Sequence, residues 1–351
     1  MKNAGAIISG YGLVTPLGQN ADSTFDALMC ARFITDHHRA AGGADRGVQM
    51  ARAAGEEAIG RAGWNRDDRS EAGLIVATSK GTLESLITPH HEAIANSPFI
   101  AAGGWDRLGL GGPRLVFSAA CASGLHALIR GALMIAAGEA RRVLVVGYEA
   151  SVHPLFVGSF NRLGIIAPAG EVCRPFDQTR SGFLVSEAAA AVCLQADGGG
   201  EIRLENFAMG GDATHLTGGD PHGCTLRRML CGLIGETKLD LIHAHGTGTE
   251  FNDPVELAAI EAAAPRQSVR PAVYSHKGAI GHSLGAAGLI AVVINCMCHQ
   301  RSVIPPNVQT LRPLETSAIS INAAAIDRRI DRSLAMAAGF GGAMAAAVLW
   351  G

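Results

Sequence analysis

Short apolar runs of β-type residues alternate with longer Ala-, Gly- and Leu-rich segments along most of this 351-residue chain. The β-type runs are nearly continuous in apolar residues, which suits strands whose two faces are both covered by helices. The predicted strands are 74–78, 114–118, 142–147, 188–194, 239–244, 271–275, 333–338 and 345–349. The predicted helices are 47–62, 122–137, 254–264 and 283–299. This order of elements predicts an α/β fold.

The composition agrees with extensive burial and gives no general sign of a charged partner. Hydrophobic residues make up 48% of the chain, charged residues 17%, and the formal net charge is -2. A chain of this length can bury one large core or two smaller ones. The near-neutral balance does not favour nucleic acid or an anionic membrane surface as a partner.

The best internal boundary lies at residues 195–201, where Ala-Asp-Gly-Gly-Gly favours a flexible turn. It divides the chain into an N-terminal half, 1–196, and a C-terminal half, 197–351. In both halves an apolar strand leads through a short loop into a helix, and a chemically capable residue stands near the start of that helix. These residues are Cys121 and His282, and the repeated layout predicts a duplicated α/β unit.

The apolar segment 278–298 is nearly long enough to span a bilayer, but it contains His282, Asn295 and several glycines. A buried core helix is therefore the better interpretation. The first ten residues lack a secretory pattern, because glycine interrupts a short apolar stretch. The eight cysteines lack zinc-finger spacing and are expected to be free thiols in a reducing, cytoplasmic compartment. We expect neither a membrane span nor a bound metal.

Residues 117–126 place Cys121 where an extended run becomes a helix, between small residues that leave room for a substrate. A helix N-terminus carries partial positive charge, which favours a thiolate and predicts a lowered thiol pKa. The backbone N–H groups there are also available to an oxyanion. A buried structural cysteine is the open alternative for this segment taken alone.

His245 ends an apolar strand and is followed by small and hydroxylated residues, before a helix that starts at Asp253-Pro254. Strand tips are a usual place for active-site groups in α/β sheets. Thr247 and Thr249 could hydrogen-bond an extended, amide-bearing ligand. The alternative is a turn in which Asp253 caps the helix and backbone groups satisfy the histidine.

Lys277 and His282 lie in a glycine-rich loop that precedes a very apolar helix. A lysine here should be exposed, or buried with a partner, and Glu256 is the candidate partner. A phosphate-binding loop is the rival interpretation, but its pattern G-x-x-x-x-G-K-[ST] does not occur, since Lys277 precedes the glycines. The neighbouring His276 is interpreted as structural.

Residues 338–344 place Phe340 between glycines near the C-terminus. Gly339 and Gly341 give the backbone freedom, so this segment could be a mobile loop that presents Phe340 to a pocket. A tight turn between two strands is the alternative, and most glycine clusters of this kind are turns.

Six motifs follow one another in a fixed order over nearly the whole chain, and together they are far more specific than any one of them. Their residues are 8–18, 120–124, 174–177 with 182–183, 245–249, Lys277 with 281–282, and 339–342. They closely resemble the ketoacyl-acyl carrier protein synthases, the elongating condensing enzymes of fatty acid and polyketide synthesis. The resemblance implies the thiolase fold, in which two duplicated α/β halves form a layered αβαβα core.

The resemblance also implies roles for the site residues. Cys121 would accept the acyl group as the nucleophile, and His245 and His282 would bind the malonyl thioester carbonyl and assist decarboxylation. Lys277 would organise the site electrostatically with Glu256.

The motif around Phe340, with Gly339 and Gly341, resembles the gating loop of the family. The backbone N–H of Phe340 would join that of Cys121 in the oxyanion hole. The implied partners are an acyl carrier protein, whose phosphopantetheine carries the substrates, and a second subunit in a homodimer or a ketosynthase heterodimer. No other cofactor and no metal is implied.

The chain departs from the family pattern in several places. It is shorter, with compression expected at 28–49 and 84–110, and Asn252 and Ser186 replace usual glycines. Residues 343–344 are Ala-Met where the family has Thr-Asn, which removes two polar side chains that would brace the gating loop. These departures bear on substrate scope and loop movement more than on the catalytic set.

Two other functions compete with this interpretation. A ketosynthase-like partner subunit, which shapes a pocket without condensing, has no need of Cys121, His245 and His282 together. A coenzyme A thiolase would need a second cysteine near the C-terminal glycine loop, and the chain has none after Cys298. The sequence therefore favours an elongating ketosynthase.

Overall fold

The computed structural model describes residues 5–43, 46–81 and 105–351. The strands are β1 (Ile7–Val14), β2 (Gly73–Ala77), β3 (Arg114–Phe117), β4 (Arg142–Glu149), β5 (Ala188–Gln195), β6 (Ile202–Gly211), β7 (Leu241–His243), β8 (Ala272–Tyr274), β9 (Val303–Ile304), β10 (Ser320–Ile321), β11 (Ile326–Asp327), β12 (Arg332–Ala338) and β13 (Ala343–Trp350). The α-helices are α1 (Ala21–Met29), α2 (Arg46–Ala62), α3 (Arg66–Glu71), α6 (Ser123–Ala136), α7 (Pro154–Arg162), α8 (Cys224–Ile234), α9 (Asn252–Ala263), α10 (Lys277–Ile280) and α11 (Ala287–Arg301). Short 3-10 turns are η2 (Asp106–Leu108), η3 (Leu284–Ala286) and η4 (Phe340–Gly342).

The two halves of the chain repeat the same spatial order of strands. In the first half the spatial order is β1-β5-β4-β2-β3, and in the second it is β6-β13-β12-β7-β8, with β10 added at the edge. In both halves the first two pairings are antiparallel and the next two are parallel. The halves meet where β1 pairs with β6 through Ile7 and Ile8. The predicted duplication of an α/β unit is therefore confirmed, and the division at residue 196 stays a prediction.

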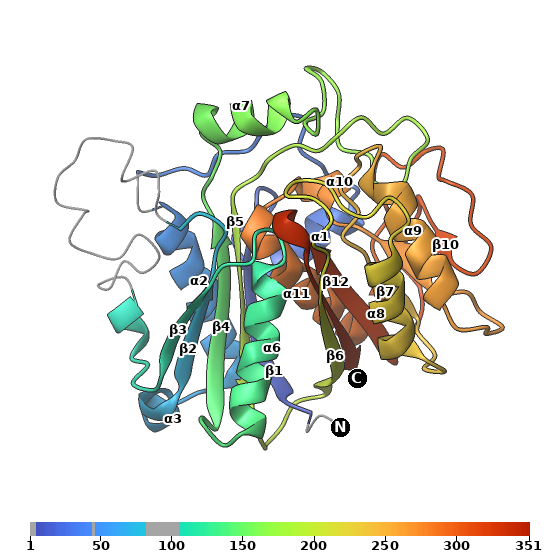
Figure 1. Cartoon of the computed structure of the whole chain (residues 1–351). Helices are drawn as coiled ribbons and strands as arrows, with labels where there is room; N and C mark the ends of the chain where they lie inside the picture. Colours follow the sequence, from blue (N-terminus) through green and yellow to red (C-terminus); the bar gives the residue numbers. More distant parts are fainter. Residues whose placement is uncertain (1–4, 44–45, 82–104) are drawn as a thin grey trace.

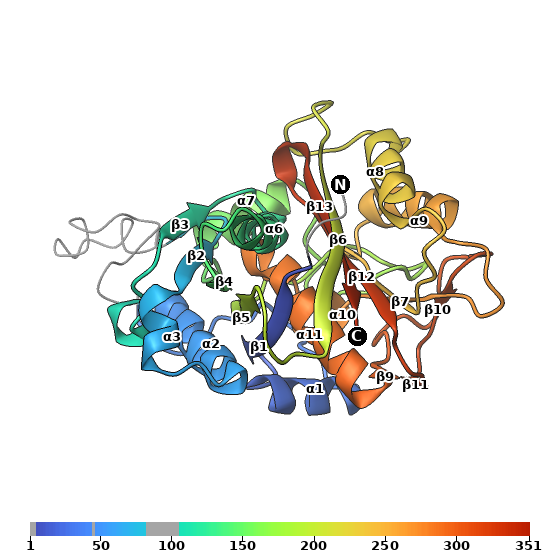
Figure 2. The same cartoon turned by 90° about the horizontal axis from the view of Figure 1, so that it is seen from below.

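Helices fill the space between the two halves and cover their outer faces (Figure 1). Seen from below, α6 and α11 lie between the two sets of strands, with α2 outside one set and α8 and α9 outside the other (Figure 2). In agreement, α6 packs on β4 and β13, and α11 packs on β5 and β12, so each central helix contacts strands of both halves. This is the layered αβαβα arrangement that the resemblance implies.

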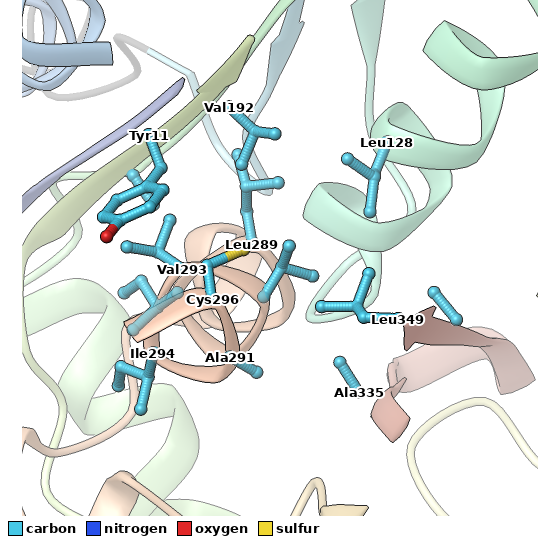
Figure 3. Packing of buried hydrophobic residues seen from close by; sticks show 14 of the residues in the cluster. Tyr11, Leu128, Val192, Leu289, Ala291, Val293, Ile294, Cys296, Ala335 and Leu349 are labelled. Atoms are coloured by element: carbon cyan, nitrogen blue, oxygen red, sulfur yellow. The ribbon is translucent and has the colours of Figure 1, made fainter. Parts of the chain in front are cut away.

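The helix α11 is buried almost throughout, because both halves pack on it. Figure 3 shows Leu289, Val293 and Cys296 of this helix among side chains that come from both halves, such as Val192 and Leu349. Of the described residues, one helix is long and apolar enough to cross a membrane, Leu284–Arg301, and 83% of it is buried in the protein. The burial agrees with the predicted core helix.

Glycines set how closely α6 and α11 approach each other. A Cβ on Gly124, in the first turn of α6, would lie 2.8 Å from the backbone nitrogen of Leu289. A Cβ on Gly288 would lie 2.9 Å from the side chain of Leu125. The two helices therefore touch near their N-terminal ends, where any side chain would hold them apart.

Several elements lie outside the predicted pattern for identifiable reasons. The strand β6 has only Ile202 and Leu204 buried and carries Arg203 and Glu205, so it forms no continuous apolar run. The helix α7 has only Phe160 buried, which leaves little helical periodicity to detect. The expected compression at 84–110 falls largely outside the described residues.

The glycine contact between the central helices gives the first prediction. We expect Gly124→Ala to lower the free energy of unfolding by about 1–3 kcal/mol, because the added methyl group meets backbone rather than a flexible side chain. Gly60→Ala on α2 is the control, since open space surrounds that position and alanine favours a helix. Denaturant-induced unfolding measures both, and equal stability of the two variants would contradict the role of the contact.

Candidate active site

A tight turn holds Cys121 between β3 and α6. The hydroxyl of Ser123 accepts a hydrogen bond from the backbone N–H of Ala119 at 2.9 Å and donates one to the carbonyl of Ala120 at 2.6 Å. Ala120 has φ +49°, a left-handed conformation that is strained for a residue with a side chain. The turn places Cys121 half-buried, two residues before α6 begins.

The backbone of His245 is held from both sides. The Glu256 carboxylate accepts hydrogen bonds from the N–H groups of His245 and Gly246, the latter at 2.8 Å. The Lys277 ammonium donates to the carbonyl of His245. Lys277 and Glu256 are both buried, and they act on opposite ends of one residue at the tip of β7.

This arrangement corrects the expected partnership of the two charged residues. The ion pairs of the described residues do not include a Lys277–Glu256 bridge, although the opposite charges favour each other's ionised forms through space. Glu256 is occupied by backbone N–H groups and by the side chain of Asn252 at 2.9 Å. The two groups cooperate through His245 rather than by direct contact.

His282 lies beside His245 and also belongs to the second half of the chain. Its backbone N–H donates to Leu184 at 2.7 Å and its carbonyl accepts from Ser186 at 3.1 Å. Its ring meets the ring of His245 edge-on, with 5.4 Å between centroids, and the ring of Phe183 with 5.0 Å between centroids. The loop and its contacts therefore fix both imidazoles beside each other.

A cavity of about 370 Å³ brings the predicted residues together. Its walls include Cys121 from the first half and His245 and His282 from the second. Thr247 and Thr249 also line it, and their hydroxyl groups are 2.9 Å apart. The sequence-predicted nucleophile, imidazoles and hydroxyl groups thus face one space.

The glycine-rich loop near the C-terminus closes one wall of this cavity. It is a turn between β12 and β13, and Phe340 lines the cavity with its ring 6.3 Å from that of Phe160. A Cβ on Gly339 would lie 3.0 Å from the backbone nitrogen of Cys121, so only glycine lets the loop approach this closely. Gly341 has φ +77°, the left-handed region that favours glycine.

Comparison with known protein families agrees with this geometry. Residues 18–197 match the Beta-ketoacyl synthase, N-terminal domain, and residues 205–310 match the Beta-ketoacyl synthase, C-terminal domain. The chain belongs to the beta-ketoacyl synthase family. The members of this family are condensing acyltransferases, so the protein is an enzyme of that class.

Related synthases align with almost the entire chain. It is 28% identical to a putative polyketide beta-ketoacyl synthase 1 of Streptomyces halstedii, over 98% of this chain and 97% of the relative. It is 26% identical to 3-oxoacyl-[acyl-carrier-protein] synthase 2 of Coxiella burnetii, over 99% of each chain. The first alignment spans 413 positions against 351 residues here, so this synthase lacks segments that the relative has.

Solved structures show the same fold. A Beta-ketoacyl synthase from Burkholderia phymatum STM815 superposes with a TM-score of 0.85 at 22% identity, covering 100% of this chain and 99% of that chain. A ketosynthase bound to a hexaketide, in complex with its type II polyketide acyl carrier protein, superposes with a TM-score of 0.84 at 20% identity and full coverage of both chains. The thiolase-like fold of the synthase is therefore established.

Burial controls the protonation states in the synthase. It lowers the pKa of His245 and of His282 well below 6.5, and the charge of Lys277 acts in the same direction. Both imidazoles are therefore neutral at neutral pH and can each donate one hydrogen bond. Burial also raises the pKa of Glu256 to about 7, assisted by the neighbouring Asp253.

The expected lowering of the thiol pKa is wrong as a net effect. Burial raises the pKa of Cys121 to about 11, and this outweighs the charges of Lys80 and Lys277, which lower it. Position at a helix N-terminus does not decide the ionisation of a thiol that is also desolvated. The thiol of the free synthase is therefore mainly protonated at neutral pH.

Two further residues near the cavity differ from the sequence-based picture. Asp253 lies inside α9 rather than at its cap, and its carboxylate accepts from the backbone N–H groups of Phe176, Thr247 and Gly248. Phe160 was not among the predicted residues, although it lines the cavity. Its spacing of four from Phe156 is the one sequence signal that could have indicated an aromatic face on a helix.

His276 belongs to a second buried histidine pair, whose members do not line the cavity. Its Nδ1 lies 2.8 Å from Nε2 of His243, whose Nδ1 lies 2.9 Å from the side-chain oxygen of Asn295. Burial lowers the pKa of His243 to about 3 and that of His276 well below 6.5. The pair fits the structural role expected for His276.

These neutral histidines predict a loss of stability in acid. As the pH falls below about 6.5, the unfolded chain binds protons at these histidines and the folded synthase does not. The free energy of unfolding should therefore fall, by up to about 1.4 kcal/mol per pH unit for each buried histidine. Glu256 acts in the opposite sense between its ordinary pKa and about 7, because the folded form takes up a proton first.

The variant His276→Gln tests this dependence, because it removes one titrating group and keeps a side chain that can hydrogen-bond. We expect its stability to fall less steeply than that of the wild type between pH 7 and 5, as measured by thermal unfolding. His222→Gln is the control, since that side chain is exposed. A slope unchanged by His276→Gln would show that this histidine titrates alike in both states.

Proposed function

We propose that this synthase elongates acyl chains by decarboxylative condensation, with the growing acyl group held on Cys121. The observation that carries the proposal is the shared cavity, in which a thiol from one half faces two neutral imidazoles from the other. A thioester-forming nucleophile and two hydrogen-bond donors are what this reaction needs. No redox step is involved.

The reaction has two halves. In the first, the Cys121 thiolate attacks the carbonyl of an acyl thioester, the carrier thiol leaves, and the acyl group becomes attached to sulfur. In the second, a malonyl thioester loses CO2 and keeps the bonding electrons as an enolate. The enolate carbon attacks the acyl carbonyl, the bond to Cys121 breaks, and a β-ketoacyl thioester remains on the carrier.

His245 and His282 are proposed to hold the malonyl thioester carbonyl during decarboxylation. A neutral imidazole donates one hydrogen bond, and two such donors stabilise the negative charge that develops on the enolate oxygen. Their low pKa values keep them in this form over the neutral range. Lys277 and Glu256 are proposed to keep His245 in place through its backbone.

The loop at Phe340 is proposed to supply the second part of the oxyanion site. Gly339 approaches the backbone nitrogen of Cys121, which supports a shared hole made by the N–H groups of Cys121 and Phe340. Phe340 would also gate the cavity through its contact with Phe160. Thr247 and Thr249 would then hydrogen-bond the amide-bearing arm of the substrate.

The proposed substrates are carried on the phosphopantetheine of an acyl carrier protein, with no other cofactor. The solved neighbour that is complexed with its carrier protein supports this partner. A second subunit, as a homodimer or a ketosynthase heterodimer, and a cytoplasmic location are also proposed. The neighbouring structure of a ketosynthase/chain length factor supports the heterodimer as one of the two forms.

The acyl-accepting role of Cys121 gives a direct test. Incubation with acyl carrier proteins that bear a series of acyl chains should add one acyl group to the wild type, and none to Cys121→Ala, because the thioester needs sulfur. Cys173→Ala is the matched control, since that thiol is buried in the same hydrophobic cluster. Mass spectrometry of the intact protein measures the outcome, and acylation that persists without Cys121 would overturn the proposal.

The two histidines should affect one half-reaction more than the other. We expect His245→Ala and His282→Ala to slow decarboxylation of malonyl-carrier protein by roughly two orders of magnitude, because each removes a donor to the enolate oxygen. Acyl transfer to Cys121 should slow much less. Release of labelled CO2 and acylation of Cys121 are measured side by side, and equal losses in folded variants would contradict this division of roles.

A further inference from the structure

Lys80 lies beside the candidate active site and was not among the predicted residues. It follows β2 by three residues, at the edge where β2 and its parallel neighbour β3 both end. Its ammonium lies 5.2 Å from the ring centroid of Phe160 and 5.3 Å from that of Phe156, and it is 3.2 Å from the hydroxyl of Ser79. Three contacts thus hold the charge in one place.

The segment that carries Lys80 is anchored to the active-site loop. The backbone N–H of Ser79 donates to the Glu149 carboxylate at 3.0 Å, and its hydroxyl donates to the same oxygen. The N–H of Gly285 donates to that oxygen at 3.1 Å. A Cβ on Gly285 would lie 2.5 Å from the nitrogen of Ser79, so the two segments touch directly.

Phe160 connects the ammonium to the nucleophile. Its ring forms part of the wall of the cavity that contains Cys121, and Cys121 packs against the same hydrophobic cluster. The ring of Phe160 therefore meets the ammonium of Lys80, and the cluster to which Phe160 belongs packs against the thiol. A low-dielectric wall of this kind screens a nearby charge less than water does.

The charged groups around Cys121 differ in their hydrogen-bond partners. Lys277 is buried and donates to the carbonyl of His245, and Glu149 accepts the hydrogen bonds described above. His245 and His282 are neutral and add no charge. Lys80 is half-buried, and within the described part of the chain its ammonium bonds the neutral hydroxyl of Ser79 and contacts no carboxylate directly.

We propose that Lys80 is a positioning residue whose ammonium stabilises the Cys121 thiolate and so sets the reactivity of the nucleophile. The inference rests on the proposed function only in taking Cys121 as the acyl acceptor. A burial-raised thiol pKa makes such a charge useful, because the thiolate is the reactive form. Of the positive charges that lower the pKa of Cys121, that of Lys80 has a larger effect than that of Lys277.

The experiment measures alkylation of Cys121 by iodoacetamide, a neutral reagent whose approach does not depend on charge. Modification of the Cys121 peptide is followed by mass spectrometry in the full chain between pH 7 and 10, with Cys121→Ala as the blank. Lys80→Met removes the charge, Lys80→Arg keeps it, and Lys238→Met is a control at an exposed lysine. Lys80→Gln replaces Lys80→Met if that variant does not fold.

We expect Lys80→Met to alkylate about threefold more slowly at a given pH for each unit by which the thiol pKa rises. The factor is below ten because a more basic thiolate is also a better nucleophile. Lys80→Arg and Lys238→Met should follow the wild type. Melting temperatures of all variants are recorded, since a packing role alone would lower stability without displacing the pH profile.

Two results would overturn the inference. The first is a pH profile of Lys80→Met that coincides with the wild type. The second is an equal loss of alkylation in Lys80→Met and Lys80→Arg at every pH, which would mean that the side chain controls access rather than charge. Alkylation reports on the thiol whether or not acyl groups are condensed. Absence of acylation at Cys121 would therefore contradict the proposed function without bearing on the role of Lys80.

Discussion

The close approach of α6 and α11 is the constraint on which the rest of the molecule depends. These two helices form the central layer, and each begins near a candidate catalytic residue, Cys121 or His282. Gly124 and Gly288 allow the helix ends to touch, which brings the loops of two separate halves to one cavity. In the described residues, β1–β6 is the one pairing between named strands of the two halves, and it is short, so the packing of these helices carries much of the contact between the halves.

Burial at that junction has opposite consequences for the two kinds of group it brings together. It keeps His245 and His282 neutral, which suits hydrogen-bond donation to a carbonyl oxygen. The same burial disfavours the Cys121 thiolate, which is the form that attacks in the proposed reaction. A buried site therefore favours the proposed decarboxylation step and disfavours the proposed acylation step, unless positive charge lies nearby. Lys277 and Lys80 lie on two different segments, and the charge of each lowers the pKa of Cys121.

The sequence predicts the parts of this arrangement that depend on short-range patterns. Buried strands and the apolar α11 stand out because their burial leaves continuous hydrophobic runs, and Cys121, His245 and His282 stand out because each follows such a run or precedes such a helix. Three-dimensional contacts are harder to predict. Nothing in the chain around Lys277 indicates that it bonds a carbonyl of His245 instead of the Glu256 carboxylate, because both choices satisfy a buried lysine. Nor does the sequence around Lys80 indicate that its ammonium lies over the ring of Phe160, which lines the cavity.

The loop at Phe340 shows how a missing side-chain brace can be replaced by backbone. Ala343 and the residue after it belong to β13, and they pair with β6 instead of supporting the loop with polar groups. The loop is held instead by the N–H of Gly341, which donates to Leu216 at 2.8 Å, and by the carbonyl of Gly342, which accepts from Asp212 at 2.9 Å. A Cβ on Gly342 would lie 1.5 Å from the carbonyl oxygen of Asp212, so this contact requires glycine. Both bonds join the loop to the segment after β6. A movement of Phe340 must therefore break these hydrogen bonds or move that segment as well. The proposed gating by Phe340 would therefore involve residues 212–216 as well as the glycine-rich turn.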